Sequence, residues 1–523
     1  MEQQLHDEDT APSSLSKNIE QSHELVDSKL EKEQPETKNN QRAILLAPIL
    51  ESFPFFAGLS FLFGVLFTFC LYKNPCSITY PIFTGISCLL GIFICQKLHI
   101  PMKKGSWFLL TTALLVGIST CRTADSFIIF INGIALLLLG FIFSLHQFYE
   151  DKTWNIGKYL SSIFLQFIYA VESITLPFRH LKQYLKTQDN KIIRQLPVLF
   201  VGFLAALPIL ALLTTLLGEA DIIFSDLMTH IFYDFLQPVT LFDLCFRTIF
   251  GALALYCLVC SCCLHKISQE NADRRKGNPL LVITGLSMIA IIYILFCSIQ
   301  VIYLFLRRGS LPEEYTFSSY ARQGFFQLLL VAFLNLTIVL CCLKYVRPQK
   351  VLQMILTIIC FCTYIMIASA CYRLMMYVRE YHLSYLRVLA LWFLTVLAIL
   401  MAGVTWLIWH QQFPLFSYSL VVVSICYVAL ALARPDSVIA WDYVNHLDKN
   451  EVSPKDLYYL NSLSADAAPA FSFLFHTQEK DHELFTNLAD YYYTQHTWSE
   501  YRTLGIRNYN FSFAQAKKLF PRH

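Results

Sequence analysis

The stretch EYTFSSYARQGFFQLLLVAFLNLTIVL, from Glu314 to Leu340, holds the pattern that decides the fold. From Phe325 onward it is an apolar run without a charged residue, and about 20 such residues form a helix that crosses roughly 30 Å of hydrocarbon. Polar side chains stand at the start of this run, namely Tyr320, Arg322 and Gln327. The pattern predicts a transmembrane helix with a polar collar at its entrance.

Apolar runs of this kind recur along most of the chain. Of its 523 residues, 56% are hydrophobic and 15% are charged, which does not fit a water-soluble surface. We therefore predict an all-α, polytopic transmembrane helical bundle of about eleven spans. The predicted spans are 54–72, 78–96, 106–120, 126–146, 195–217, 241–263, 280–306, 324–343, 351–371, 386–409 and 415–433.

Composition also divides the chain into segments. Residues 1–42 are acidic and polar, so they cannot bury enough apolar surface to fold alone, and we predict a disordered tail. N-terminal transmembrane helices occupy 43–146, and an amphipathic interfacial linker occupies 147–194. A transmembrane core follows at 195–433. The last segment, 434–523, is polar and rich in aromatic residues and predicts a small helical C-terminal domain.

The linker at 147–194 carries an apolar stripe at helical spacing, with basic residues on either side of it. Such a stripe is typical of a helix that lies in the membrane interface, although an ordinary packing helix remains an alternative. The stripe consists of Leu160, Ile163, Phe164, Phe167, Ile168 and Val171. A second, acidic amphipathic stretch follows the fifth span and contains Asp221, Asp226 and Asp234.

The distribution of basic residues predicts the orientation. The net charge of +3 is too small, and too dispersed, for nucleic-acid binding. Basic residues gather in alternate loops, around Lys97–Lys104, 152–194, 266–276 and Lys344–Lys350. The positive-inside rule then places these loops and the N-terminus in the cytoplasm. We expect a multi-pass protein of the cell membrane, with the lipid bilayer as its surroundings.

No motif of a known soluble enzyme is present, and we identify no catalytic residue, metal ligand or cofactor. His146 and Asp151 have the H-x4-D spacing of lipid acyltransferases, but a solvated helix end is the favoured interpretation. Nearly all of the 17 cysteines fall in apolar spans, where a thiol behaves as a small hydrophobic group. Cys257, Cys260, Cys262, Cys263 and His265 match no closed zinc site, so we expect no metal there.

Ionisable groups in or near the spans are the candidate site residues, because an unpaired charge in hydrocarbon is costly. Asp243 and Arg247 lie four residues apart on one helix face and predict a structural salt bridge. A candidate polar pocket at the outer membrane boundary consists of Gln300, Tyr320, Arg322, Gln327, Arg373 and Glu380. Arginine side chains that extend to lipid headgroups are the alternative.

Several stretches resemble known bacterial membrane families. They are LLGEADIIFSDLM (Leu216–Met228), SIQVIYLFLRRGSLPEEYTFSSYARQGFFQLLLVAFLNL (Ser298–Leu336), ASACYRLMMYVREYHLSYLRVL (Ala368–Leu389), RPDSVIAWDYVNHL (Arg434–Leu447) and DLYYLNSLSADAAPAF (Asp456–Phe471). In this order they are similar to domains of unknown function 4173 and 4153. Trp441 and Asp442 stand where members of these families tend to have Arg and Tyr. The resemblance implies a bacterial inner-membrane protein without an assigned activity, substrate or cofactor.

The functional expectation is an integral membrane protein of the cell envelope that is not an enzyme. It would act as a sensor or an assembly partner, meeting other proteins through its N-terminal tail and C-terminal domain. One alternative is a transporter of a lipid-like or small anionic compound. The other is a membrane-embedded transferase that uses Asp221, Asp226 or Glu313 as a base.

Overall fold

A computed structural model of the chain describes nine blocks of residues and isolated positions between 195 and 221. The blocks are 46–74, 76–151, 154–187, 238–264, 266–267, 277–302, 324–446, 454–477 and 506–519. The predicted tail at 1–42 lies outside them. So do most of the predicted span at 195–217, Asp226 and Asp234, the side chain of His265, and both Tyr320 and Arg322.

The described elements are helices, in agreement with the predicted fold class. The long ones are α2 (Phe53–Leu71), α3 (Thr79–Lys97), α4 (Lys104–Arg122), α5 (Ser126–Phe148), α6 (Ile156–Glu172), α7 (Leu176–Thr187), α10 (Pro238–Cys263), α11 (Pro279–Gln300), α13 (Phe325–Tyr345), α14 (Lys350–Tyr381), α15 (Tyr385–Trp409) and α16 (Leu415–Ala433). Shorter ones follow, namely α17 (Pro435–His446), α18 (Pro454–Asn461), α19 (Ala468–Thr477) and α21 (Phe511–Leu519).

Eleven helical stretches of the described residues are long and apolar enough to cross a membrane, so the chain is a multi-pass membrane protein. Ten of them coincide with predicted spans. The third is longer than the sequence suggested, because α4 runs from Lys104 to Arg122 rather than over 106–120. The remaining stretch, Ile156–Thr187, matches no predicted span. It contains α6 and α7 and falls within the predicted interfacial linker.

Contacts divide the chain into two compact units. The smaller comprises Met1–Leu62, Ile168–Phe242 and Ala252–Lys266, and the larger comprises Phe63–Phe167, Asp243–Gly251 and Ile267–His523. Within the smaller unit, α7 packs on the second half of α10. At this contact the Nδ1 atom of the buried His180 lies 2.9 Å from the Tyr256 hydroxyl. Beyond the end of α10, Lys266 donates to Glu172, the last residue of α6, over 2.8 Å.

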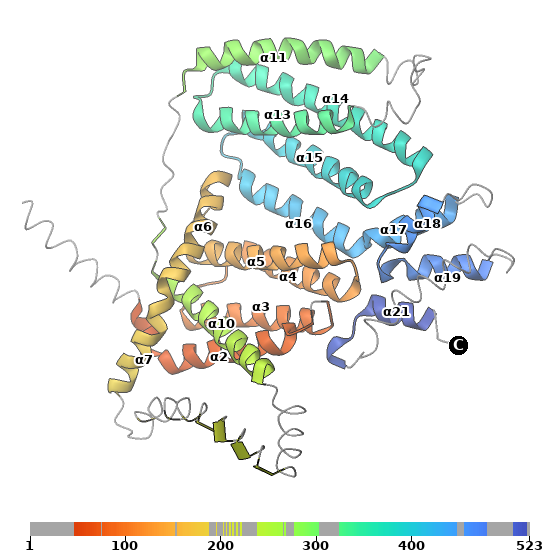
Figure 1. Ribbon diagram of the computed structural model, residues 1–523. Coiled ribbons are helices and arrows are strands. Elements are labelled where there is room, and N and C mark those ends of the chain that lie inside the picture. Colours follow the sequence, from red (N-terminus) through yellow and green to blue (C-terminus); the bar gives the residue numbers. More distant parts are fainter. Residues whose placement is uncertain are drawn as a thin grey trace, which may run out of the picture. The chain divides into compact units, whose positions relative to one another are not determined.

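The helices of the larger unit lie side by side (Figure 1). Helix α4 packs between α3 and α5 and also contacts α16; α16 packs on α15, α15 on α14, and α14 on both α13 and α11. Side chains on the outer faces of these helices are apolar and exposed, among them Leu89, Phe130, Met288 and Phe361. Such faces are compatible with lipid and not with water.

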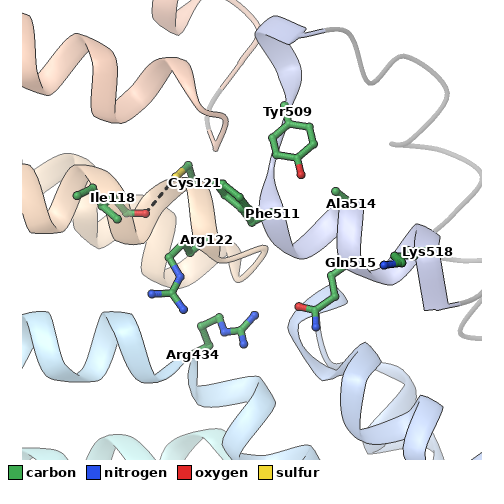
Figure 2. A pocket seen from close by; sticks show the side chains of 9 residues that line it. All are labelled: Ile118, Cys121, Arg122, Arg434, Tyr509, Phe511, Ala514, Gln515 and Lys518. Carbon is green, nitrogen blue, oxygen red and sulfur yellow. Dashed lines mark hydrogen bonds between the residues drawn. The ribbon is translucent and has the colours of Figure 1, made fainter.

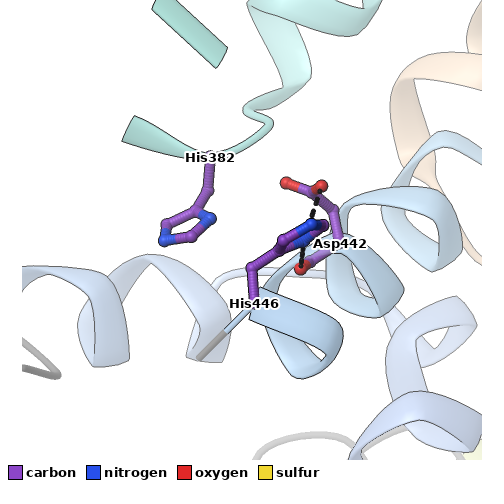
Figure 3. A group of neighbouring side chains, drawn as sticks. All are labelled: His382, Asp442 and His446. Carbon is purple, nitrogen blue, oxygen red and sulfur yellow. Dashed lines mark hydrogen bonds and ion pairs between the residues drawn. The ribbon is translucent and has the colours of Figure 1, made fainter. Parts of the chain in front are cut away.

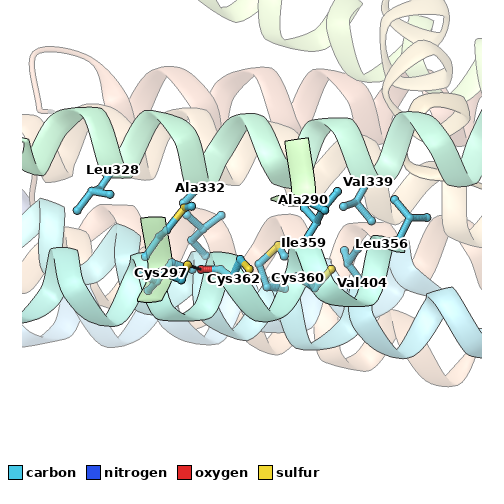
Figure 4. Close-up of a cluster of buried hydrophobic side chains, with 14 of the residues drawn as sticks. Ala290, Cys297, Leu328, Ala332, Val339, Leu356, Ile359, Cys360, Cys362 and Val404 are labelled. Atoms are coloured by element: carbon cyan, nitrogen blue, oxygen red, sulfur yellow. Dashed lines mark hydrogen bonds between the residues drawn. The ribbon is translucent and has the colours of Figure 1, made fainter. Parts of the chain in front are cut away.

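The core of this unit is a layer of mostly small and branched side chains between α11, α13, α14 and α15 (Figure 4). Ala290, Ala332 and Cys360 allow the helices to approach closely, as small residues do in membrane interfaces. The buried Asn335 amide is satisfied there, because it accepts from the Tyr293 hydroxyl at 2.7 Å and donates to Thr363 Oγ1 at 2.9 Å. The Asn335 side chain is therefore hydrogen-bonded although it is buried in an apolar layer.

Turns connect the helices at the two ends of the larger unit. At one end, which we call the basic end, lie the turns 98–103, 149–155, 346–349 and 410–414. Contacts tie these turns together: Lys103 Nζ donates to the Tyr149 carbonyl over 2.7 Å, and Gln353 donates to the carbonyl of Ile408 over 2.8 Å. The opposite end, which we call the distal end, carries the turns 72–78, 123–125 and 382–384.

Helix α6 extends across the basic end and not along the bundle (Figure 1). Its residues up to Phe167 contact the ends of three bundle helices in turn. A Cβ on Gly157 would meet Lys344 Nζ of α13, Tyr159 stacks on Phe416 of α16, and Gln166 donates to Ser144 of α5 over 2.8 Å. A helix with these contacts lies over the bundle end, where the interfacial linker is predicted.

The helices after Arg434 pack on the distal end. Asp466 is fully buried and accepts three hydrogen bonds, two of which come from the turn between α4 and α5. Its donors are Thr123 Oγ1 at 2.5 Å, the Ala124 amide at 3.1 Å, and Ser512 Oγ of α21. Burial raises the pKa of this carboxyl, while the donated hydrogen bonds act in the opposite direction.

Candidate functional site

Three cationic side chains meet in an open pocket at the distal end. Arg122 is the last residue of α4, Arg434 follows α16, and Lys518 lies in the last turn of α21. The pocket has a volume of about 570 Å³, within the usual range for small-molecule sites. Ile118, Cys121, Tyr509, Phe511, Ala514 and Gln515 complete its lining.

Local backbone chemistry explains how Arg434 is placed. Pro435 follows it, and a proline disfavours the α conformation in the residue before it. Helix α16 therefore ends at Ala433, and Arg434 adopts a left-handed conformation with φ 54°. That conformation costs a non-glycine residue about 1 kcal/mol or more, and such strained residues cluster at functional sites.

The guanidinium groups of Arg122 and Arg434 both lie in the space between the ends of α4 and α16 (Figure 2). Gln515 of α21 extends toward the same space from the other side. Among the residues that the structure describes, neither guanidinium has a hydrogen bond or an ion pair with a side chain. Asp466 is the acidic group whose charge interacts with Arg434, but it is buried behind the pocket and does not line it.

The rest of the lining is apolar or neutral. Phe511 and Tyr509 present aromatic surface, and their rings pack edge-on with centroids 5.3 Å apart. Ile118 and Ala514 add aliphatic surface, and the Cys121 thiol donates to the Ile118 carbonyl over 3.2 Å. Cationic and apolar groups side by side match a ligand that is itself anionic at one end and apolar at the other.

The predicted polar pocket is described only in part. Gln300 and Arg373 are both buried and lie together, since Arg373 Nη2 donates to Gln300 Oε1 over 3.2 Å and Ser369 Oγ donates to the same oxygen over 2.7 Å. Gln327 is exposed on the first turn of α13. Tyr320, Arg322 and the side chain of Glu380 lie outside the described residues, so the pocket remains a prediction.

Gly324 lies directly against this pair. It begins α13 with φ 92°, and a Cβ built on it would stand 2.8 Å from Arg373 Nη1. The glycine therefore leaves room for the guanidinium beside the entrance of the helix. The group that approaches Gly324 is Arg373 of α14.

Asp243 and Arg247 lie on one face of α10, and Arg247 Nε donates to Asp243 Oδ1 over 2.8 Å. Both side chains are more than a third exposed, so an ion pair between them contributes little to stability. The Arg247 guanidinium also lies 5.5 Å from the centre of the Tyr72 ring. The geometry is that of a surface pair.

His146 and Asp151 do not form a solvated helix end, and that interpretation was wrong. His146 Nδ1 lies 2.6 Å from Asp151 Oδ2, and the Tyr159 hydroxyl donates to the same oxygen. Burial alone would raise the pKa of Asp151, but the bonds to His146 and Tyr159 lower it below its usual range. Tyr159 belongs to α6, so the group joins α6 to the end of α5.

Sequence reasoning missed Arg122 and Arg434 as site residues. Each stands at the end of a predicted span, where an arginine is common, and single-sequence patterns do not show which span ends are neighbours. The Arg–Pro pair at Arg434 was the available signal, since it marks a forced helix end. The contact between α4 and α16, which joins the two arginines, is visible only in the structure.

Comparison with protein families gives one match. A family described as "Domain of unknown function (DUF4153)" matches residues 110–472, which is more than half of the chain. Both pocket arginines fall within that range, whereas Lys518 and the rest of α21 lie beyond it. The resemblance to domain of unknown function 4173 stays a prediction. No curated protein and no solved structure matches the chain.

Proposed function

This chain belongs to the DUF4153 family, and we propose that it is a non-catalytic membrane sensor that binds an anionic amphiphile in the pocket of Arg122, Arg434 and Lys518. The proposal rests on one observation. Three cationic side chains share a pocket, and among the residues that the structure describes, its lining includes no carboxylate and the two guanidiniums have no side-chain partner. Like charges placed together favour an anion between them.

The lining also supports the apolar part of the ligand. Phe511, Tyr509 and Ile118 offer surface that a fully hydrophilic anion would not use. The pocket opens at the distal end, where the last residue of a span meets the polar helices after Arg434. A phosphate or carboxylate group attached to an alkyl chain fits both features. A lipid headgroup and a free anionic amphiphile share this chemistry.

Binding is favoured over catalysis by the residue types present. A transferase needs a general base near its substrate, and the lining residues within the described part of the chain include neither an imidazole nor a carboxylate. Asp226 and Glu313, suggested above as bases, lie outside the described residues. We further propose that the N-terminal tail and the C-terminal helices meet protein partners, and that the distal end faces the outside of a bacterial inner membrane.

The test uses the full-length protein in a neutral detergent. Short-chain phosphatidic acid is added, and the shift in melting temperature (Tm) is recorded. Short-chain phosphatidylcholine, inorganic phosphate and lyso-phosphatidic acid are added in parallel. We expect phosphatidic acid to raise Tm by several degrees, since a ligand that binds only the folded state stabilises it. Phosphate alone should give a smaller shift, and phosphatidylcholine none.

Variants then locate the effect. Arg122→Gln and Arg434→Gly should each reduce the affinity for phosphatidic acid at least about tenfold, since charge-assisted bonds are lost. Glycine is chosen at position 434 because it tolerates φ 54° without strain. Arg247→Gln removes one exposed arginine outside the pocket and is the matched control. Equal affinity in all three variants would refute the pocket as the binding site.

A further inference from the structure

His382, Asp442 and His446 form a second group of chemically capable side chains at the distal end (Figure 3). His382 lies in the turn between α14 and α15, whereas Asp442 and His446 lie one helical turn apart on α17. Each offers one ligand atom, and these atoms all lie within 4.8 Å of one another. It is the only such group of three among the residues that the structure describes.

The Asp442 carboxylate is oriented by the turn itself. The Leu383 amide donates to Asp442 Oδ2 over 2.8 Å, which leaves Oδ1 toward His446. His446 Nδ1 lies 3.4 Å from that Oδ1 and 2.9 Å from the Asp442 carbonyl. A hydrogen bond from outside the ligand set that orients a carboxylate is a regular feature of metal sites.

The position of His382 is held by the backbone. This residue has φ 57°, a conformation that a non-glycine residue adopts at a cost. Arg387 Nη1 donates to the carbonyls of both Tyr381, over 2.6 Å, and His382. The His382 ring packs on the Tyr443 ring with centroids 4.9 Å apart. The strained turn thus directs this imidazole toward α17.

We propose that His382, Asp442 and His446 bind a divalent transition-metal ion, with zinc as the best fit. Two imidazoles and one carboxylate are a common zinc ligand set, at about 2.0–2.2 Å from the ion, with a fourth position for water or another ligand. Calcium and magnesium prefer oxygen ligands and are poorly matched by two nitrogens.

The ion would join the transmembrane bundle to the helices that follow it. His382 belongs to the turn between two bundle helices, and the other two ligands belong to the first helix after α16. A bound ion would therefore restrain α17 against the α14–α15 turn, and its binding would stabilise the folded state. The site involves none of the residues that line the arginine pocket. A negative result for one proposal therefore does not affect the other.

Zinc chloride is the probe, with full-length protein that has been treated with a chelator in detergent at pH 7.5. Isothermal titration should show one equivalent of zinc bound, and Tm should rise with zinc and not with magnesium. His446→Ala and Asp442→Asn should each weaken zinc binding at least about tenfold, as loss of a metal-site interaction does. Asp442→Asn keeps an acceptor for the Leu383 amide, so its fold is preserved.

One control variant, one variant that should fold normally and a second metal ion complete the experiment. His410→Ala removes an exposed imidazole at the basic end and should leave zinc binding unchanged. His446 is itself 65% exposed, so His446→Ala should fold even if changes at His382 do not. Cobalt should give the visible absorption of a site without sulfur ligands. Zinc binding that is unchanged in His446→Ala, or a thiolate band with cobalt that places the ion at cysteines, would overturn the proposal.

Discussion

Arg373 shows how a single buried charge can be accommodated where a span ends. Its guanidinium bonds to Gln300 and lies against Gly324, so residues of α11 and α14 meet the residue that precedes α13. Helix α14 has 32 residues, more than the roughly 20 that a span needs. A position near the membrane boundary, which the sequence predicts for Arg373, would lower the cost of its charge.

The first prediction concerns Gly324. Gly324→Ala should lower the free energy of unfolding by about 1–2 kcal/mol, since alanine is strained at positive φ and its Cβ would press on Arg373. Denaturation in a mixed-micelle titration measures the change. Gly285→Ala on α11 is the control, because a Cβ there meets nothing within 4 Å. Equal losses in the two variants would contradict the contact with Arg373.

The second prediction concerns Asp436, a buried carboxyl that accepts from the Ser464 amide over 2.9 Å. Burial, together with the charges of Asp125 and Asp466, raises its pKa to about 6. In the unfolded chain the pKa of an aspartate is about 3.9. Between these values the folded state binds more protons than the unfolded state, so stability falls as pH rises and the loss is complete above about pH 6.

Replacing Asp436 by asparagine should remove this loss. The Asp436→Asn protein should match the native one near pH 4 and exceed it at pH 8, by up to about 3 kcal/mol. Its amide oxygen still accepts from Ser464. Tm measured at both pH values gives the comparison, and Asp243→Asn, at an exposed pair, should show no such gain. A Tm difference independent of pH would exclude the ionisation of Asp436 as the cause.

At the scale of elements, the question is whether α6 and α7 span the membrane. Their length and apolar content satisfy the requirements for a span. Helix α6 nevertheless contacts the ends of α13, α16 and α5 in turn. Its buried face is polar, with Ser162 and Gln166, while Leu160, Phe164 and Phe167 are exposed. These contacts place α6 against the ends of bundle helices, and its location in the membrane interface stays a prediction.

The third prediction tests this placement. A topology reporter fused after Glu150 and another fused after Thr187 should report the same side of the membrane, because a helix in the interface does not cross it. A reporter fused after Arg122 should report the opposite side and serves as the control, since α5 crosses between Arg122 and Glu150. Reporters on opposite sides at Glu150 and Thr187 would show that α6 and α7 form a span.

At the scale of the whole molecule, the larger unit constrains the number of crossings. Phe167 lies near the basic end, packed on Phe141 of α5. Thr248 lies near the distal end, where its hydroxyl is 2.9 Å from that of Thr68 in the last turn of α2. We therefore expect an odd number of crossings between these two residues. The predicted span at 195–217, together with α6 and α7 in the interface, meets this expectation.

The fourth prediction follows from the same count. If the basic end is cytoplasmic, the helices after Arg434 lie outside, because they pack on the distal end. A reporter that is active only outside the cytoplasm should be active when fused after His523 and inactive when fused after Lys97. Activity at Lys97 instead would reverse the orientation of the whole bundle. Activity at both positions would show that the crossings have been miscounted.

The sequence by itself determined the membrane class, the helical fold and nearly all span positions. These properties depend on local composition, because a stretch of about 20 apolar residues crosses hydrocarbon whatever its neighbours are. It also indicated the exposed apolar stripe of α6, since amphipathicity is a local pattern, while the interfacial location of this helix stays a prediction. The contacts of Gln300 with Arg373 were only suggested, as two polar groups near one boundary.

Only the tertiary structure decided which span ends are neighbours. Arg122 and Arg434 share a pocket because α4 packs on α16, and His382 meets Asp442 and His446 because α17 lies against the α14–α15 turn. All outer faces of the spans are similarly apolar, so hydrophobicity does not select partners among helices in lipid. Close packing and a few buried hydrogen bonds select them, and these depend on side chains far apart in the sequence.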